Sequence, residues 1–382
     1  MRARSIVAGV VGAAVLAAAG GLAAMAAEYA RQLVTPARRP DRPSRILAFT
    51  GDAVTIQRYS EAGRPGRYGM WFDEDRGYLR VGEVLEQTRV SVTRAVDLIE
   101  AGEPAEGMTC RMTGSYWRDP AAAGLAHEDV LVPTALGPMP AWFVPPQAGE
   151  PWRDVVILVH GWGASRAEPL RAVPAIARAG WSSLVVTYRN DVGVPAAPDR
   201  RYHLGAEEWR DVEAAIGFAL ERGAERIALA GWSMGGGTVL QTLLRSRLAD
   251  RVERIVLDSP AIDWWSILRA QGRAASLPAP VAPLTGAIVS SRVASRLVGL
   301  AEPIPLSELR AAGFAERLST PALLIQGDDD PTTPVEAARA LAAARPDLIE
   351  YAEFPGAGHV RCWNADEARY AGLLTDWLTR AR

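Results

Sequence analysis

Short apolar runs alternate with longer amphipathic stretches over the second half of the chain. The apolar runs cover residues 155–159, 183–187, 227–230, 255–257, 323–325 and 349–354. Helical spacing of apolar residues appears between them, most clearly over residues 207–221 and 335–344. Alternation of buried strands with helices is typical of a parallel sheet covered on both faces. We therefore predict an α/β catalytic domain over residues 129–382.

Two features modify this regular alternation. Residues 129–132 and 141–144 read as an antiparallel strand pair that begins the sheet. Residues 261–320 contain apolar helical stretches and several prolines but no strand. A connection of this length is usually functional, so we predict a helical lid there.

The pattern before residue 129 is different. Residues 46–49 and 53–56 are apolar runs on either side of a Gly-Asp pair, which is typical of a hairpin. Further short strand-like runs occur at residues 78–81 and 89–92. We predict a small β-rich accessory region over residues 46–128, joined to what precedes it by a polar linker rich in arginine and proline at residues 28–45.

The N-terminus carries an uncharged apolar run over residues 5–27, after Arg2 and Arg4. About 20 residues of helix cross a bilayer, so this run predicts a transmembrane anchor. The Ala24-Met25-Ala26 sequence allows the alternative of a cleaved signal and a secreted protein. Positively charged residues favour the cytoplasmic side of a span, but arginines lie on both sides of this run and so do not agree on its orientation. We expect the catalytic domain to be extracytoplasmic.

Composition excludes several functions. Among 382 residues, 49% are hydrophobic and the net charge is −2, so no bulk attraction to nucleic acid is expected. The two cysteines are too few for a disulfide framework or a thiolate metal site, and no histidine pair has ligand spacing. We expect no metal and no cofactor.

The strongest chemical signal is Gly-Trp-Ser-Met-Gly at residues 231–235, between a predicted strand and a predicted helix. This is the pattern of a nucleophile elbow, which holds Ser233 on a tight turn and directs the Met234 amide at developing negative charge. Upstream, His160 to Gly163 follows the first buried strand directly. The Trp162 amide is therefore the predicted second donor of the oxyanion hole, while His160 is expected to stabilise its own loop.

A serine nucleophile needs a base. In proteins with this elbow the acid and the histidine follow the serine in chain order, and of the four histidines only His359 does so. We expect the acid that orients this histidine in the loop after the strand at residues 323–325, where position and spacing favour Asp330. Asp258, at the end of the preceding strand, stays open as an alternative, as do Asp328 and Asp329.

Together these motifs resemble those of the α/β-hydrolase superfamily over residues 129–382, most closely bacterial esterases, dienelactone hydrolases and prolyl-oligopeptidase-type enzymes. The resemblance implies about eight mostly parallel strands, no cofactor, and acyl transfer by a Ser233–Asp330–His359 triad. Gln326 departs from the pattern, because relatives often have histidine there, and the accessory region is not part of the shared core.

We predict a serine hydrolase that cleaves a small-molecule carboxylic ester or thioester through an acyl-enzyme. A peptidase or acyltransferase with the same triad is an alternative. A membrane-tethered binding module without activity is another, and loss of a triad residue would mark it. Trp264 and Trp265 open the predicted lid and either line the substrate pocket or pack the lid onto the core.

Overall fold

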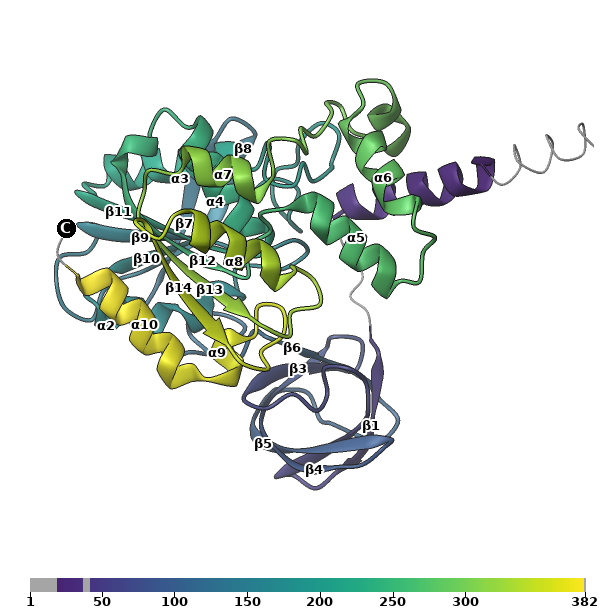
Figure 1. Cartoon of the computed structure of the whole chain (residues 1–382). Helices are drawn as coiled ribbons and strands as arrows, with labels where there is room; N and C mark the ends of the chain where they lie inside the picture. Colours follow the sequence, from purple (N-terminus) through teal and green to yellow (C-terminus); the bar gives the residue numbers. More distant parts are fainter. Residues whose placement is uncertain (1–18, 37–41, 381–382) are drawn as a thin grey trace, which may run out of the picture.

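The computed structural model describes residues 19–36 and 42–380, which form an α/β part and a separate β-barrel (Figure 1). The α/β part is built on one eight-stranded sheet in the order β14-β13-β12-β11-β9-β10-β8-β7. Its strands are β7 (Glu128–Thr134), β8 (Gly137–Val144), β9 (Asp154–Val159), β10 (Ser182–Val186), β11 (Arg226–Trp232), β12 (Val252–Asp258), β13 (Ala322–Gly327) and β14 (Ile349–Phe354).

Strands β9 to β14 run parallel, whereas β7 and β8 form an antiparallel pair at one edge, with β8 beside β10. Side chains of β9 alternate between two apolar cores, because successive residues of a strand point to opposite faces. Ile157 lies in one core, and Val156 and Leu158 lie in the other. A sheet buried on both faces explains why its strands read as continuous apolar runs.

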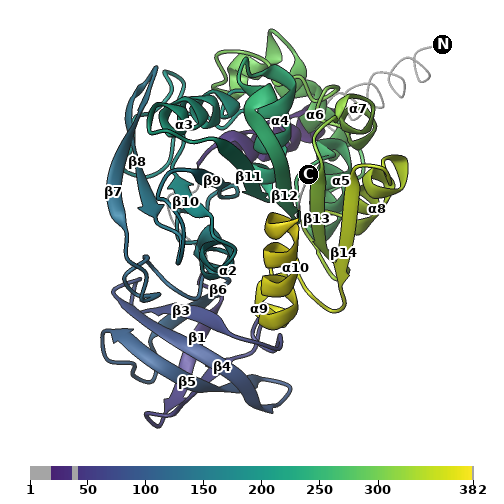
Figure 2. The same ribbon diagram turned by 90° about the vertical axis from the view of Figure 1, so that its left-hand side faces the viewer.

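Helices cover both faces of this sheet (Figure 2). Helices α3 (Trp209–Glu221), α4 (Met234–Arg245) and α8 (Val335–Ala344) pack on one face, and α2 (Val173–Arg178) and α10 (Glu367–Thr379) pack on the other. The prediction of a mostly parallel α/β sheet is confirmed.

The segment between β12 and β13 is helical. It contains α5 (Trp264–Ala274), α6 (Val281–Ser290), the 3₁₀ turn η3 (Ala294–Val298) and α7 (Ala311–Arg317). Asp263 caps α5 by accepting hydrogen bonds from the backbone amides of Trp265 and Ser266. This helical lid corresponds to the segment predicted at residues 261–320.

The accessory part is a closed six-stranded barrel in the order β1-β2-β5-β4-β3-β6. Its strands are β1 (Ser44–Phe49), β2 (Ala53–Gln57), β3 (Tyr68–Phe72), β4 (Gly77–Gln87), β5 (Ser91–Ala101) and β6 (Thr109–Thr113). Closure occurs because β1 pairs with both β2 and β6. The sequence predicts the β content and the first hairpin but not β3, β6 or the closure.

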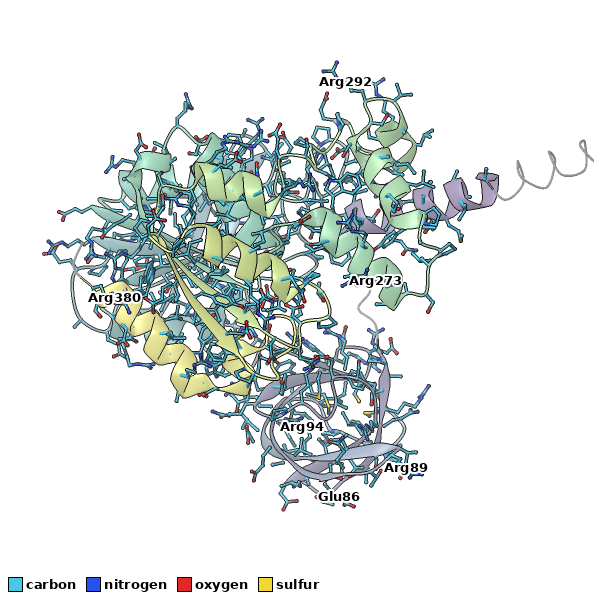
Figure 3. The ribbon with its side chains drawn as sticks, viewed as in Figure 1. Glu86, Arg89, Arg94, Arg273, Arg292 and Arg380 are labelled. Carbon is cyan, nitrogen blue, oxygen red and sulfur yellow. The ribbon has the colours of Figure 1, made fainter. Side chains whose placement is uncertain are left out.

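Arg94 lies inside this barrel (Figure 3) and is fully buried. Its guanidinium donates to four backbone carbonyls, at Ala62, Arg64, Gly66 and Gly82. Burial lowers the pKa of Arg94. The side chain thereby holds the loop of residues 62–66, which faces the α/β part.

The N-terminal segment differs from the prediction. A helix covers residues 19–34, so the linker predicted over residues 28–45 is wrong for residues 28–34. Ala26, Ala30 and Val34 are fully buried at four-residue spacing, which is one face of a helix. In the sequence, these apolar residues alternate with polar residues such as Glu28 and Arg31. In the structure, they pack the N-terminal helix (residues 19–34) onto the lid.

The predicted membrane span falls mainly on residues 5–18, which lie outside the described residues. A search of residues 19–36 and 42–380 finds no helix whose length and apolar character would carry it across a membrane.

Candidate active site

Ser233 joins β11 to α4 at the carboxyl end of the sheet. Its backbone angles are φ 52° and ψ −119°, a conformation that costs free energy for a residue with a side chain. The neighbouring chain maintains it, because the Ser233 amide donates to the Asp258 carbonyl at 2.9 Å. The Ser233 carbonyl in turn accepts from the Ala261 amide at 2.9 Å. The turn therefore holds the Ser233 side chain at the start of α4.

The two glycines of the elbow are required by close backbone contact. A Cβ on Gly231 would lie 2.4 Å from the Gly235 carbonyl oxygen. A Cβ on Gly235 would lie 2.1 Å from the carbonyl oxygen of Val159, at the end of β9. Both distances are far below van der Waals contact, which explains the Gly-x-Ser-x-Gly spacing.

Ser233, His359 and Asp330 come together from three separate loops. His359 Nε2 lies 2.9 Å from Ser233 Oγ, and His359 Nδ1 lies 2.8 Å from Asp330 Oδ2. An ionised carboxylate only accepts hydrogen bonds, so the Nδ1–H donates to Asp330 and Nε2 is left to accept the Ser233 hydroxyl proton. The three residues follow β11, β13 and β14, whose carboxyl ends meet at this edge.

The Asp330 side chain is fully buried within a set of donors. Its Oδ1 accepts from the amides of Thr332 and Thr333, and its Oδ2 accepts from the Thr333 hydroxyl at 2.7 Å and from Gln326 Nε2 at 3.0 Å. Burial alone would raise the pKa of Asp330, but His359 and the bonds from Thr333 outweigh it and lower that pKa. Gln326, the departure from the family pattern, thus becomes a partner of the acid.

The other candidate acids have different partners. Asp258 is buried and accepts from the Tyr370 hydroxyl of α10 at 2.9 Å and from the Ser259 hydroxyl at 3.0 Å. Asp328 accepts from the Gly356 amide at 2.6 Å, and Asp329 pairs with Arg64 of the barrel at 2.9 Å. None of the three forms a hydrogen bond with His359 within the described chain.

The loop after β9 lies beside the elbow. Gly161 is so close to the serine that a Cβ on it would lie 2.9 Å from Ser233 Cβ. The Gly161 amide is occupied by Glu168, whereas no acceptor among the described residues is found for the amides of Trp162 and Met234. The first turn of α4 adds the positive end of a helix dipole.

His160 is buried next to this loop. Its Nε2 lies 2.8 Å from Asp191 Oδ2, its Nδ1 lies 2.9 Å from the Gly161 carbonyl, and its ring stacks on Tyr188. These contacts agree with the expectation that His160 stabilises its own loop. They also give Asp191 a role in anchoring that loop.

A cavity of about 300 Å³ opens at Ser233 and is mostly apolar. Its walls come from the lid, the β9 loop and the N-terminal helix, and its lining includes Trp162, Ala261, Trp264, Ile267, Tyr29 and Leu33. Trp264 therefore lies where the sequence suggests a substrate pocket. Trp265 does not line the cavity; its ring packs against Gly286 of α6 and holds the lid helices together.

Tyr29, Gln32 and Leu33 are site residues that the sequence does not reveal, because they lie in the segment predicted as a linker. The Trp162 indole donates to the Leu33 carbonyl at 2.9 Å and links the N-terminal helix to the β9 loop. The only available signal is the four-residue spacing of Ala26, Ala30 and Val34.

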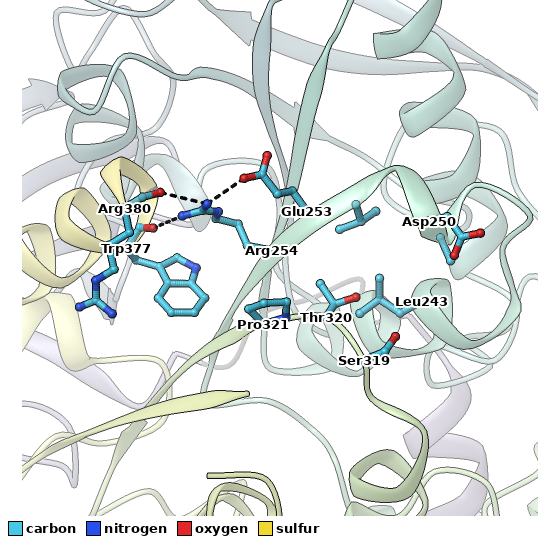
Figure 4. A pocket seen from close by; sticks show the side chains of 11 residues that line it. Leu243, Asp250, Glu253, Arg254, Ser319, Thr320, Pro321, Trp377 and Arg380 are labelled. Carbon is cyan, nitrogen blue, oxygen red and sulfur yellow. Dashed lines mark hydrogen bonds and ion pairs between the residues drawn. The ribbon is translucent and has the colours of Figure 1, made fainter. Parts of the chain in front are cut away.

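A second cavity, of about 570 Å³, lies at the opposite end of the sheet (Figure 4). Arg254 crosses it and donates to the Trp377 and Arg380 carbonyls and to Glu253. Enzymes with parallel sheets use the carboxyl ends of the strands, and this cavity contains none of the predicted site residues. In the described ranges no group of three or more His, Cys, Asp or Glu side chains could hold a metal ion.

Comparisons with known proteins agree with the fold. A model of the alpha/beta hydrolase family matches residues 156–373, more than half of the chain. A second model, described as a domain of unknown function (DUF8805), matches residues 45–113, which form the barrel. A search of curated proteins found no match.

Solved structures resemble the α/β part. One crystal form of the esterase Pf2001 of Pyrococcus furiosus shares 18% identity with a TM-score of 0.52, over 69% of this chain and 94% of that chain. A second crystal form gives 19% identity and the same TM-score, over 69% and 95%. Identity this low shows a shared fold.

With the elbow, the sheet order and the family match in place, the chain belongs to the alpha/beta hydrolase family. Its described part adds a six-stranded barrel and an N-terminal helix to that fold.

Proposed function

We propose that the protein is a serine hydrolase that cleaves carboxylic esters or thioesters. Ser233 is the nucleophile, His359 the general base and Asp330 the acid that orients it. The observation that carries the proposal is the continuous chain of hydrogen bonds from Ser233 through His359 to Asp330, at 2.9 and 2.8 Å, at the mouth of an apolar cavity.

The proposed reaction has two halves. Ser233 Oγ attacks the acyl carbonyl carbon while its proton passes to His359 Nε2, and the imidazolium then gives that proton to the departing alcohol or thiol. Water repeats the sequence on the acyl-enzyme, which releases the acid and restores Ser233. Asp330 stays ionised throughout and stabilises the imidazolium; its lowered pKa suits that role.

The oxyanion of each tetrahedral intermediate is assigned to the Trp162 and Met234 amides. Both lack another acceptor in the described chain; Met234 follows Ser233 directly, and Trp162 follows Gly161, which lies against Ser233. Donors aimed at developing charge are typically worth about 10²–10³ in kcat each.

The cavity suggests the acyl half of the substrate. No charged side chain of residues 19–36 and 42–380 lines it, and its volume of about 300 Å³ is at the small end of ligand pockets. An uncharged acyl group of short to medium length fits these properties. The test is kcat/KM for a series of 4-nitrophenyl esters from acetate to palmitate, with the matching 4-nitroanilides to detect a peptidase. Hydrolysis of no member of either series would reject the proposal.

The first prediction concerns the lid tryptophans. Changing Trp264 to Ala should lower kcat/KM for the best ester by about tenfold or more, because apolar contact with the acyl chain is lost, and should affect the acetate ester little. Trp265→Ala is the matched control, since Trp265 contacts the lid and not the cavity. It should lower the melting temperature without changing the preferred chain length. A shift of preference in the Trp265 variant alone would contradict the assignment.

The second prediction concerns the N-terminus. We propose that the apolar run of residues 5–27 is a membrane anchor up to the point where Ala26 packs on the lid, with the catalytic domain outside the cytoplasm. Deleting residues 1–18 should release the protein from membranes and keep its activity. Deleting residues 1–36 should also abolish the preference for longer acyl groups, because Tyr29 and Leu33 form part of the cavity wall.

Two measurements complete this test. A Tyr29→Ala/Leu33→Ala variant of the full chain should reproduce the altered chain-length profile even if the longer deletion does not fold. Mass spectrometry of the membrane-bound protein should find residue 1 or 2 at its start. A mature chain that starts near Ala27 would show that the segment is a cleaved signal and not an anchor, and would favour the alternative of a secreted protein.

A further inference from the structure

A third cavity, of about 560 Å³, lies between the barrel and the α/β part. We call it the barrel groove. Its lining includes Trp71, Tyr78 and Arg111 of the barrel, Trp117 and Arg118 of the segment that follows β6, and, on the α/β side, the β9 loop and Arg361. Among the described residues, the lining therefore combines four aromatic rings, that of Trp162 included, with three guanidinium groups and one carboxylate, that of Glu168.

The aromatic rings form a packed surface. Trp71 and Tyr78 meet edge to face with ring centroids 4.6 Å apart. Trp71 pairs directly with Arg111 across β3 and β6, and the Arg111 guanidinium lies 5.6 Å from the Trp71 ring. Arg118 lies over Tyr78 at 5.4 Å. The arginines are thus held beside rings that themselves offer a face for stacking.

The groove arginines retain donors for a ligand. Arg118 binds Glu100 through Nε at 2.8 Å, and Arg111 binds Asp75 through Nε at 3.3 Å. Within the described chain, the terminal nitrogens of both side chains have no hydrogen-bond acceptor. Glu100 is moreover shared with Arg80, so one carboxylate faces two guanidinium groups. A guanidinium fork of this kind matches a carboxylate or a phosphate.

The groove is connected to the proposed reaction centre by one residue. Trp162 lines both the barrel groove and the apolar cavity at Ser233, and its amide is the proposed oxyanion donor. A substrate with its acyl group in the apolar cavity would direct its leaving group past Trp162. Glu168, the one acid among the described lining residues, accepts from the Gly161 amide at 2.7 Å and keeps its negative charge. Three guanidinium groups thus face one carboxylate in the groove, which favours an anionic ligand.

We propose that the barrel groove binds the leaving-group half of the substrate, and that this half carries an anionic group, a carboxylate or a phosphate, on a flat ring. The inference rests on the proposed function and names its substrate class: esters that are apolar on the acyl side and negatively charged on the alcohol side. The barrel thereby acquires a function in specificity.

The test compares three butyrate esters of similar size: neutral 4-nitrophenyl, 3-carboxy-4-nitrophenyl, and 4-(phosphonooxy)phenyl butyrate. Each kcat/KM is divided by the hydroxide-catalysed rate of the same ester to remove differences in reactivity. The wild-type protein should favour at least one charged ester by about tenfold or more, the effect of one or two charge-assisted bonds. The charged ester whose corrected kcat/KM exceeds that of the neutral ester identifies the anionic group as a carboxylate or a phosphate.

The variant Arg111→Gln/Arg118→Gln should raise KM for the charged ester by a similar factor and leave kcat and the neutral ester unchanged. Arg89→Gln is the matched control, because Arg89 is an exposed arginine on the far side of the same barrel (Figure 3). Equal effects on charged and neutral esters, or no preference in the wild type, would overturn the proposal.

Calorimetric titration with phenyl phosphate and with benzoate tests the groove without catalysis. One of the two should bind to the wild type and to a Ser233→Ala variant, and binding should be lost in the double arginine variant. If none of the three esters is hydrolysed but this binding occurs, the proposed hydrolase function is wrong, whereas the proposal of an anion site is supported. If neither compound binds while the neutral ester is hydrolysed through Ser233, the proposal of an anion site is wrong and the proposed hydrolase function is retained.

Discussion

Changing Ser233 to alanine is expected to lower kcat by about 10⁶-fold, and changing His359 to alanine by a similar factor. The two residues act as one unit, since the hydroxyl attacks only as His359 Nε2 takes its proton across the 2.9 Å hydrogen bond. The double variant should therefore be no slower than either single variant. The activity that remains would come from substrate binding and from the Trp162 and Met234 amides.

The measurement is kcat on 4-nitrophenyl butyrate for the two single variants and the double variant. His127→Ala is the control, because the only hydrogen bond of that ring in the described chain is to the Leu125 carbonyl, and it should retain wild-type turnover. Additive losses in the double variant would mean that Ser233 and His359 act independently. That result would contradict the proposed proton transfer.

Changing Asp330 to asparagine should lower kcat by about 10⁴-fold, the cost of the analogous change in a serine protease of another fold. An amide at this position favours the imidazole tautomer with hydrogen on Nε2, which cannot accept the Ser233 proton. It also leaves the imidazolium without a counter-charge. Folding should be preserved, because asparagine keeps an oxygen that accepts from the amides of Thr332 and Thr333.

The neighbouring acids provide matched controls for this variant. Asp258→Asn should cost far less turnover, since its amide oxygen still accepts from the Tyr370 hydroxyl. Asp328→Asn should act through the stability of the loop that contains His359, by way of the Gly356 amide. Circular dichroism checks that all three variants are folded. If Asp258→Asn loses its turnover while Asp330→Asn keeps nearly wild-type turnover, the acid of the triad is Asp258, at the end of β12.

The pH dependence of Asp330 follows from its environment. Its pKa is lower in the folded protein than in the unfolded chain, so the ionised group stabilises the fold above its unfolded pKa. That contribution is lost as the pH falls through the lowered folded pKa. The Asp330→Asn variant lacks this dependence.

The sequence predicts the sheet, and it points to the candidate site residues, through local patterns. Strands buried on two faces read as apolar runs whatever their partners are, and the elbow needs glycines within two residues of Ser233. His359 is identified by elimination, since it alone among four histidines follows the serine. Position in the loop favours Asp330 over Asp328 and Asp329, and the structure adds its 2.8 Å contact with His359 Nδ1, which spacing alone does not give.

The features that the sequence does not predict depend on contacts between distant segments. Barrel closure requires Ser44 of β1 to meet Cys110 of β6, and nothing in either strand specifies that partner. Residues 28–34 of the N-terminal helix read as a polar linker, because only a narrow stripe of them, which includes Ala30, is buried. The arginines of the barrel groove appear in the sequence as ordinary surface charges until β3 and β6 bring Trp71 beside Arg111.

Covalent labelling with a fluorophosphonate tests the central claim most directly. The reagent reacts with serines that a neighbouring base activates, and peptide mapping by mass spectrometry identifies the modified residue. We predict one phosphonylated peptide, modified at Ser233, in the folded wild-type protein, no label in Ser233→Ala, and much slower labelling in His359→Ala. Labelling of another residue, or none in protein whose circular dichroism is native, would contradict the assignment of Ser233 as the nucleophile.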